Sequence, residues 1–297
     1  MIKRQNIYAY IAVIGAMFFW GISFVWTKEL LNNNFNVIFI VTTRLGISFV
    51  LLFIIFKLAR KLERIKRKDI PKFLLLAFFE PFLYFIGENY GLEYVDASFA
   101  AIFIAIIPII IPFGLRIFCK EKLRPSIIIG VLISMVGIAI MSLGDGFAFD
   151  VSLKGVLLLS LAVVAATGYS VMLSKVLHYS PITITVYQNL IATLYYLPLF
   201  AFVKPAELTN MQFNATTIFA LVMLSVFCSS IAFLGYSYCA KRISIAKTAV
   251  FTNTIPVVTI VFAVFVGQEM LTANKIVGAV VVISGVFFSQ FILKRRK

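Results

Sequence analysis

Long runs of apolar residues follow one another along almost the whole chain, from Ile7 to Leu293, with short polar stretches between them. Each run is about 20 residues long, the length that an α-helix needs to cross the hydrocarbon core of a bilayer. The runs lack the strict alternation of a lipid-facing β-strand, so helices are expected rather than a barrel. Ten runs meet this description: 7–27, 36–56, 72–92, 97–118, 126–144, 154–174, 182–203, 215–238, 244–266 and 274–293. The pattern predicts an all-α, polytopic membrane protein of ten transmembrane helices.

Composition supports a membrane protein without a soluble domain. Of the 297 residues, 62% are hydrophobic and 13% are charged, whereas a soluble domain has about 45–50% apolar and about 25% charged residues. The first run is too long for the apolar part of a signal peptide, so we expect it to stay as the first span. Cys119, Cys228 and Cys239 have no metal-binding spacing and cannot form a disulfide framework. We therefore expect no metal and no cofactor.

The basic residues are unevenly distributed between the polar stretches. Most of the 27 Lys and Arg residues lie at the two termini and in alternate stretches, above all 57–72 and 116–124. The opposite stretches contain only Lys28, Lys154, Lys204 and Lys275. Because cytoplasmic loops carry the excess of Lys and Arg, we expect both termini in the cytoplasm and a multi-pass protein of the plasma (inner) membrane. The net charge of +15 is then explained by orientation, and no nucleic-acid partner is needed.

The two halves of the chain resemble each other. An offset of 148 residues matches several uncommon residues without a gap: Tyr90 with Tyr238, Phe103 with Phe251, Pro108 with Pro256, Glu121 with Glu269, Gly130 with Gly278, and Gly137 with Gly285. At an offset of 147, GISFVWTK (21–28) resembles GYSVMLSK (168–175). We predict two repeats, 1–146 and 150–297. Each would contain five spans, an odd number, so the second would enter the membrane in the opposite sense, as in many secondary transporters.

These motifs carry a family resemblance that covers essentially the whole chain. FFWGISFVWTK (18–28), TTRLGISFVLLF (42–53) and the two copies around Pro108 and Pro256 resemble the EamA-domain family of the drug/metabolite transporter superfamily. The resemblance implies a transporter of two five-helix repeats, in a family that moves amino acids, sugars, nucleotide bases and cationic drugs. It also implies that Arg44 fastens helices, with substrate contact as the alternative. Residues 169–200 contain no counterpart of Arg44.

Two carboxylates, Glu80 and Glu88, interrupt the third run, and Pro81 follows the first of them. On a continuous helix they would be about 80° apart around the axis and about 12 Å apart along it, with Tyr84 between them. A charge near the bilayer centre costs at least about 2.5–3.5 kcal/mol, so Glu80 must face a wet cavity, pair with a cation or stay protonated. We expect Glu80 to bind a substrate ammonium group or a proton; the alternative is a structural pair with Arg44. Glu88, nearer the outer end, suits substrate contact or a solvated interface equally well.

Aromatic residues make up 15% of the chain. Those expected around the cavity, because the resemblance places their spans there, are Trp20, Tyr84, Phe103, Tyr169, Tyr236 and Phe251. Aromatic walls with a carboxylate suit an amphipathic cation or a zwitterion such as an amino acid. Core packing explains any single one of them equally well.

Pro108 and Pro256 occupy the same position in each repeat. Each frees the carbonyl four residues earlier, at Ile104 and Thr252. The sequence leaves two interpretations open, because the prolines suit hinges that bend as the cavity alternates and also packing kinks without motion.

Together these features predict a secondary transporter that exports a small metabolite, an amino acid or a related zwitterionic or cationic compound, across the plasma membrane by alternating access. The chain contains no G-x-x-x-x-G-K-[ST] motif, which argues against direct coupling to ATP. Proton coupling, facilitated diffusion and exchange all remain open, and the pattern favours neither a monomer nor an oligomer. Two alternatives are an integral-membrane enzyme that uses Glu80 and Glu88 as an acid–base pair, and a channel or sensor. Because the only histidine, His178, has no polar cluster around it in the sequence, we do not expect an enzyme.

Overall fold

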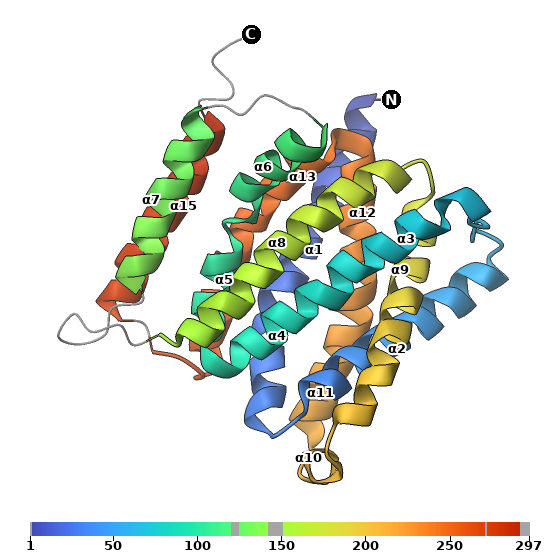
Figure 1. Ribbon diagram of the computed structural model, residues 1–297, viewed down its shortest axis with the longest axis horizontal. Coiled ribbons are helices and arrows are strands. Elements are labelled where there is room, and N and C mark those ends of the chain that lie inside the picture. Colours follow the sequence, from blue (N-terminus) through green and yellow to red (C-terminus); the bar gives the residue numbers. More distant parts are fainter. Residues whose placement is uncertain (1, 120–124, 142–150, 271, 292–297) are drawn as a thin grey trace.

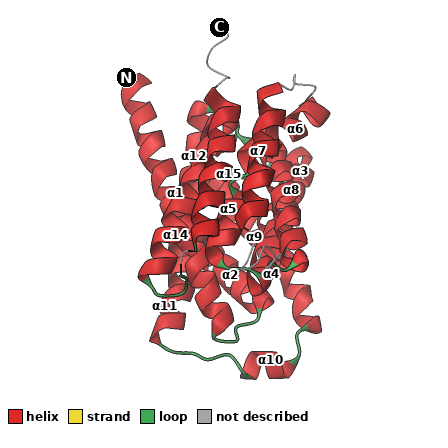
Figure 2. Ribbon diagram, turned by 90° about the vertical axis from the view of Figure 1, so that its left-hand side faces the viewer, coloured by secondary structure: helices red, strands yellow, loops and turns green. Residues whose placement is uncertain are grey.

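The computed structural model describes residues 2–119, 125–141, 151–270 and 272–291, and over these residues it is helical and contains no β-strand (Figure 1). The helices run between two ends of the molecule, and α1 (Ile2–Asn32) begins at the end where α15 (Ala273–Phe291) finishes (Figure 2). An even number of crossings produces this arrangement. The predicted all-α polytopic fold is therefore confirmed.

The described residues form ten helical segments that coincide with the ten predicted spans. In the first half they are α1, α2 (Val37–Leu58), the broken segment α3–η2–α4 (Ile70–Ala77, Phe78–Leu83 and Tyr84–Tyr94), the pair α5 and α6 (Ala97–Ile104 and Ile107–Cys119), and α7 (Pro125–Met141). In the second half they are α8 (Leu153–Val176), α9 with η4 (Pro181–Tyr196 and Leu197–Phe202), the segment α11–η5–α12 (Ala215–Met223, Leu224–Ala232 and Phe233–Ile243), the segment α13–η6–α14 (Ile245–Ala249, Val250–Thr254 and Ile255–Phe265), and α15. Among the described residues, seven segments are long and apolar enough to cross a membrane by themselves, and the apolar parts of α7 and α15 are shorter.

Three of the segments are broken in the interior of the bundle. The third segment contains a π-type stretch in which Glu80 has extended backbone angles, φ −148° and ψ 124°, just before Pro81. Pro108 lies in the first turn of α6 after the turn at 105–106, and Pro256 lies in the first turn of α14 after a 3-10 stretch. Because proline is tolerated in the first turn of a helix but not in its interior, each helix restarts at its proline. The two repeats therefore carry a break at the same position.

The helix pair α7 and α15 shows how small residues bring the two halves together (Figure 1). A Cβ atom on Gly137 would lie 2.7 Å from the carbonyl oxygen of Gly278, and one on Gly285 would lie 2.7 Å from that of Gly130. These are closer than real Cβ contacts allow, so the two backbones can meet only at glycine. Since Gly130 matches Gly278 and Gly137 matches Gly285 in the repeat, the contact is reciprocal, as a two-fold relation requires.

The other helix pairs follow the same relation. Helix α1 packs against α12 and α14, whereas its counterpart α8 packs against α4 and α6. Helix α2 packs against its own counterpart α9, and α5 packs against α14. The predicted boundary between 146 and 150 and the predicted match at Glu121 lie outside the described residues.

Candidate functional site

A buried cavity lies where the two halves meet in the interior of the bundle. The space that the centre of a water-sized sphere can reach is about 50 Å³, enough for a few water molecules. The cavity is therefore closed around its polar groups in this conformation. Its walls are formed by Trp20, Ser23 and Phe24 of α1, Arg44 of α2, Glu80, Tyr84, Phe85 and Glu88 of the third segment, Ile104 and Ile107, Ala166, Tyr169 and Ser170 of α8, Phe233 and Tyr236 of α12, and Thr252 and Ile255.

Many of the lining residues are related by the internal repeat. Ten of them fall into pairs at an offset of 147 or 148: Ser23 with Ser170, Phe85 with Phe233, Glu88 with Tyr236, Ile104 with Thr252, and Ile107 with Ile255. The last two pairs flank the breaks at Pro108 and Pro256. The cavity is therefore lined by matching positions of the two halves.

Glu80 enters the cavity from the break in the third segment. Its side chain is buried, with 7% of the residue exposed, and that of Glu88 is buried with 5% exposed. Neither carboxylate makes a hydrogen bond or an ion pair with any described residue. The helix is interrupted at Glu80, so the angle calculated for a continuous helix does not apply. Glu80, Tyr84 and Glu88 nevertheless line the same space.

Arg44 brings a positive charge to the same cavity. It is 1% exposed, and its Nε donates a hydrogen bond of 2.9 Å to Oγ of Ser229 in the second half. Its guanidinium group lies 4.3 Å above the centre of the Phe85 ring, a cation–π contact. No ion pair joins Arg44 to Glu80 or Glu88 in the described structure, although its charge acts electrostatically on Glu88. The structural pair between Arg44 and Glu80 is therefore not formed in this conformation.

The aromatic candidates divide into two groups. Trp20, Tyr84, Tyr169 and Tyr236 line the cavity, and the Trp20 ring lies 5.2 Å from that of Tyr236. Phe103 and Phe251 are not among the lining residues, because their side chains turn to other partners. Phe103 packs on Phe99 with ring centres 6.2 Å apart, and Phe251 on Tyr10 at 5.8 Å.

Sequence reasoning missed the hydroxyl groups of the cavity. Ser23, Ser170 and Thr252 line the cavity. A single serine or threonine in an apolar run does not indicate a cavity by itself. The repeat register contained the signal, since Ser23 and Ser170 occupy matching positions in GISFVWTK and GYSVMLSK. The register does not choose between Phe103 with Phe251 and Ile104 with Thr252, because both pairs match at an offset of 148.

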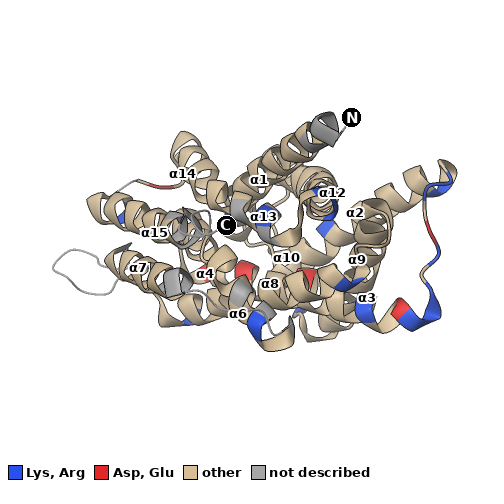
Figure 3. Ribbon diagram, turned by 90° about the horizontal axis from the view of Figure 1, so that it is seen from above, with Lys and Arg blue, Asp and Glu red and all other residues tan. Residues whose placement is uncertain are grey.

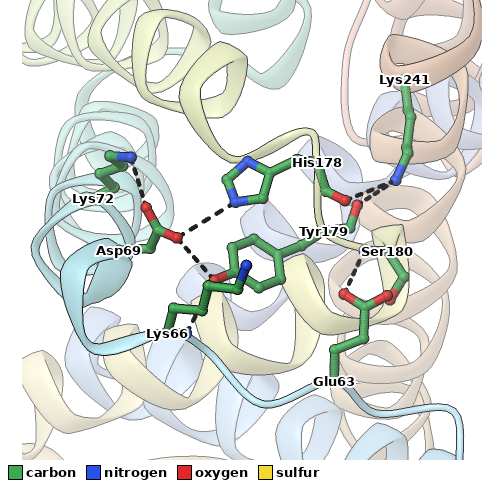
Figure 4. Close-up of polar contacts among 8 residues, drawn as sticks. All are labelled: Glu63, Lys66, Asp69, Lys72, His178, Tyr179, Ser180 and Lys241. Atoms are coloured by element: carbon green, nitrogen blue, oxygen red, sulfur yellow. Dashed lines mark hydrogen bonds and ion pairs between the residues drawn. The ribbon is translucent and has the colours of Figure 1, made fainter.

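Polar contacts close the end of the molecule that carries the termini (Figure 4). The carboxylate of Asp69, shallow but only 1% exposed, accepts hydrogen bonds from Lys72 at 2.6 Å and from the Tyr179 hydroxyl at 2.9 Å. Lys241 of α12 donates to the Tyr179 carbonyl oxygen at 2.6 Å. Burial raises the pKa of the Tyr179 hydroxyl, which therefore keeps its proton and can donate it. We call Asp69, Lys72, Tyr179 and Lys241 the inner latch.

The inner latch lies beside the most basic part of the chain. Seen from this end, blue Lys and Arg residues follow the stretch between α2 and α3 (Figure 3). Glu63 in this stretch accepts from the backbone N–H of Ser180 at 3.0 Å, and its own N–H donates to Oγ1 of Thr183 at 3.1 Å. The basic stretch of the first half is thus tied to the α8–α9 connection of the second half.

Other contacts join the helices at the opposite end, and a large hollow lies beside them. The Glu269 carboxylate accepts from the N–H of Ser98 at 2.9 Å, and Lys275 forms an ion pair with Asp96. Beside these contacts, a polar hollow of about 670 Å³ lies between Lys28, Glu93 and Glu207. The hollow and the central cavity have no lining residue in common.

No group of acidic, histidine or cysteine side chains within the described residues could hold a metal ion. The cavity instead contains two carboxylates, a guanidinium group and aromatic rings between two helical repeats. These features suit reversible binding of a charged organic molecule, and they define the class of multi-pass membrane transporters built from two repeats.

The chain belongs to the EamA-like transporter family. The model of this family matches it twice, over residues 7–143 and 153–291. The family resemblance inferred from the sequence is thereby confirmed, and the chain is a transporter rather than an enzyme.

Its relatives are similar over most of their length. An uncharacterized transporter of Archaeoglobus fulgidus is 28% identical over 91% of this chain and 94% of its own. The uncharacterized transporter YetK of Bacillus subtilis is 24% identical over 100% of this chain and 90% of its own. A probable terminal-alkyne amino-acid exporter of Streptantibioticus cattleyicolor is 24% identical over 75% of this chain and 74% of its own. A solved crystal structure with 15% identity covers 99% of both chains with a TM-score of 0.70, so the fold is shared.

Proposed function

We propose that this transporter exports a small zwitterionic or cationic metabolite, an amino acid or a close relative, across the plasma membrane by alternating access. The observation that carries the proposal is the central cavity, which contains the buried Glu80 carboxylate, without a hydrogen-bond or ion-pair partner among the described residues, next to aromatic rings. An isolated buried charge is costly, and an intramembrane carboxylate of this kind is functional by default.

In the proposed complex, Glu80 receives the ammonium group of the substrate. Tyr84, Tyr169 and Tyr236 surround it and favour a cation through their ring faces. For a zwitterion, Arg44 offers a second anchor, because only one hydrogen bond, to Ser229, is formed by its guanidinium group among the described residues. A planar guanidinium group with free N–H groups suits a carboxylate. The probable amino-acid exporter among the relatives supports this substrate class.

Transport would require each end of the cavity to open in turn. Its small volume corresponds to a closed state between the inward-facing and outward-facing forms. The breaks at Pro108 and Pro256 would serve as hinges, since they border the cavity and lie at the same position in each repeat. Glu80 could bind a proton when it does not bind substrate, which would couple export to the proton gradient.

The proposed orientation places both termini and the inner latch in the cytoplasm, because most Lys and Arg residues lie at that end. In intact cells, a membrane-impermeant thiol reagent should label Asn210→Cys on the outer side and should not label Lys66→Cys. Labelling of Lys66→Cys alone would overturn the proposed orientation but would not contradict the proposed binding site.

Counterflow in liposomes tests the transport proposal. Purified protein should exchange at least one radiolabelled amino acid or related zwitterion from a panel, at a rate well above that of empty liposomes. Glu80→Gln keeps the shape of the side chain, should fold and insert normally, and should lose this exchange. Exchange at the wild-type rate by Glu80→Gln at every pH would refute the role of Glu80.

A further inference from the structure

Three buried polar side chains lie near the cavity, and two of them, Gln188 and Ser237, take no part in the proposed binding mode. They come from three helices of the second half: Tyr169 of α8, which also borders the cavity, Gln188 of α9 and Ser237 of α12. Their residues are 2%, 0% and 0% exposed, respectively. The Tyr169 hydroxyl, both polar atoms of the Gln188 amide and the Ser237 hydroxyl have no hydrogen-bond partner among the described residues. We call these three side chains the polar triplet.

Tyr169 lies close to both other members of the polar triplet. The Tyr169 hydroxyl interacts with Ser237 and Gln188, although no pair of atoms reaches the distance and angle of a hydrogen bond. Tyr169 and Glu80 line the same cavity. Buried polar atoms are almost always satisfied by protein or by ordered water, so four unpaired atoms close together are suited to bind water.

The depth of the polar triplet places it between Glu80 and the end that carries the termini. Tyr169 lies seven residues before the end of α8, Gln188 lies seven residues after the start of α9, and Ser237 lies six residues before the end of α12. With a rise of 1.5 Å per residue, all three are about 9–11 Å from this end. Glu80 is ten residues from the start of α3 and therefore lies about 15 Å deep.

Two residues of the inner latch lie on the helices of the polar triplet or on the connection between them, nearer the end that carries the termini. Tyr179 joins α8 to α9, and Lys241 is one turn beyond Ser237 on α12. Between the two levels, Phe73 is fully buried and packs edge-on against the rings of Tyr179 and Tyr187. Polar side chains at two levels, with an aromatic plug between them, have the layout of a closed passage.

We propose that the polar triplet lines a hydrated passage through which water and protons reach Glu80 from the end that carries the termini. A proton moves along hydrogen-bonded water between the bulk and a carboxylate oxygen of Glu80, and no other bond is formed or broken. This passage goes beyond the proposed substrate, and it would serve Glu80 whether or not the substrate is a zwitterion.

Thiol labelling tests the passage without a known substrate. In a variant without the three native cysteines, Ser237→Cys should react with a small membrane-impermeant methanethiosulfonate at least tenfold faster than Val186→Cys. Val186 is the matched control because it is also fully buried, two residues from Gln188, and carries no polar group. The reagent should reach Ser237→Cys from the same side of the membrane from which it reaches Lys66→Cys. The test then does not depend on which side is cytoplasmic. Equal rates for Ser237→Cys and Val186→Cys, or labelling of Ser237→Cys from the side opposite to Lys66→Cys, would overturn the passage.

A second substitution tests whether the polar groups themselves keep the passage wet. Gln188→Leu has a similar volume and removes an unpaired buried amide, so the protein should fold. It should slow the labelling of Ser237→Cys at least fivefold, whereas Gln188→Asn, which retains an amide, should restore most of the rate. An unchanged labelling rate in Gln188→Leu would show that the side chain packs helices and does not conduct water.

Discussion

The two halves of the chain line the cavity from several matching positions, but they contribute different charges. Phe85 and Phe233 face the cavity from matching positions, as do Ser23 and Ser170. All three of its charged side chains nevertheless come from the first half: Arg44, Glu80 and Glu88. The second half contributes hydroxyl groups, aromatic rings and aliphatic side chains. The repeat therefore preserves the shape of the site while the ionic groups stay on one side.

Matching positions show where the halves diverged. The residue that corresponds to Glu88 at an offset of 148 is Tyr236, and the one that corresponds to Ile104 is Thr252. Both halves retain the proline break and the close glycine contact, which the helices need in order to pack and bend. We infer that the first half recognises the charge of the substrate and that the second half shapes the cavity and admits water.

The largest effect should come from the first half. Glu80→Gln should lower exchange about 100-fold or more, because a lost charged partner inside a protein costs about 3–5 kcal/mol. Arg44→Gln should also impair exchange, and the double variant should be no better than either single variant. Rescue of stability and exchange in the double variant, measured by thermal unfolding and counterflow, would identify the two residues as a structural pair.

The second largest effect should come from a substitution at the contact between α4, which carries Glu88, and α8 of the second half. A Cβ atom on Gly87, next to Glu88, would lie 2.4 Å from the carbonyl oxygen of Leu158 in α8. Gly87→Ala should therefore lower the free energy of unfolding by about 1–3 kcal/mol, as overpacking does. Gly15→Ala is the control, since a Cβ atom there would meet nothing within 4 Å. Equal unfolding temperatures for the two variants would contradict the close approach of α4 and α8.

The inner latch should set how often the cavity opens towards the end that carries the termini. Asp69→Asn keeps the size of the side chain but removes the charge that Lys72 and Tyr179 share. The labelling rate of Ser237→Cys should then rise several-fold. The matched change Glu207→Gln, which affects an exposed contact with Asn36 at the other end, should leave this rate unchanged. If Asp69→Asn and Glu207→Gln change the labelling rate equally, the inner latch does not control opening at the end that carries the termini.

The smallest effect should come from the neutral half. Tyr236→Phe removes one hydroxyl group from the cavity and keeps the ring that packs on Trp20. Exchange should change by about tenfold or less, because a single neutral hydrogen bond contributes about 0.5–1.5 kcal/mol. A loss in counterflow as large as that of Glu80→Gln would remove the proposed difference between the halves.

Sequence reasoning reached the fold because its signals are local and repeated. The apolar runs predict the helices, and the offset of 148 matches the glycines at which α7 and α15 meet: Gly130 with Gly278 and Gly137 with Gly285. The interior of the site was harder to predict. The break at Glu80 changes the direction of the side chains around it, so a continuous helix gives the wrong geometry.

The partners of buried polar groups could not be predicted from the sequence at all. The absence of an ion pair between Arg44 and Glu80, in the part of the chain that the structure describes, depends on how α2 and the third segment pack. Gln188 looks like an ordinary polar residue in a helix, and only the packing of α8, α9 and α12 brings it to Tyr169 and Ser237. Such contacts join distant segments, and no pattern along the chain encodes their distances.

The central claim is that the first half recognises the charge of a zwitterionic metabolite through Glu80. The most direct test compares three related compounds in counterflow by the purified wild-type protein: the amino acid that it exchanges, the analogue without the amino group, and the decarboxylated amine. The account predicts that loss of the amino group abolishes exchange, because Glu80 then faces no ammonium group, and that the amine is still bound. Exchange of the analogue without the amino group at the rate of the parent amino acid would contradict it.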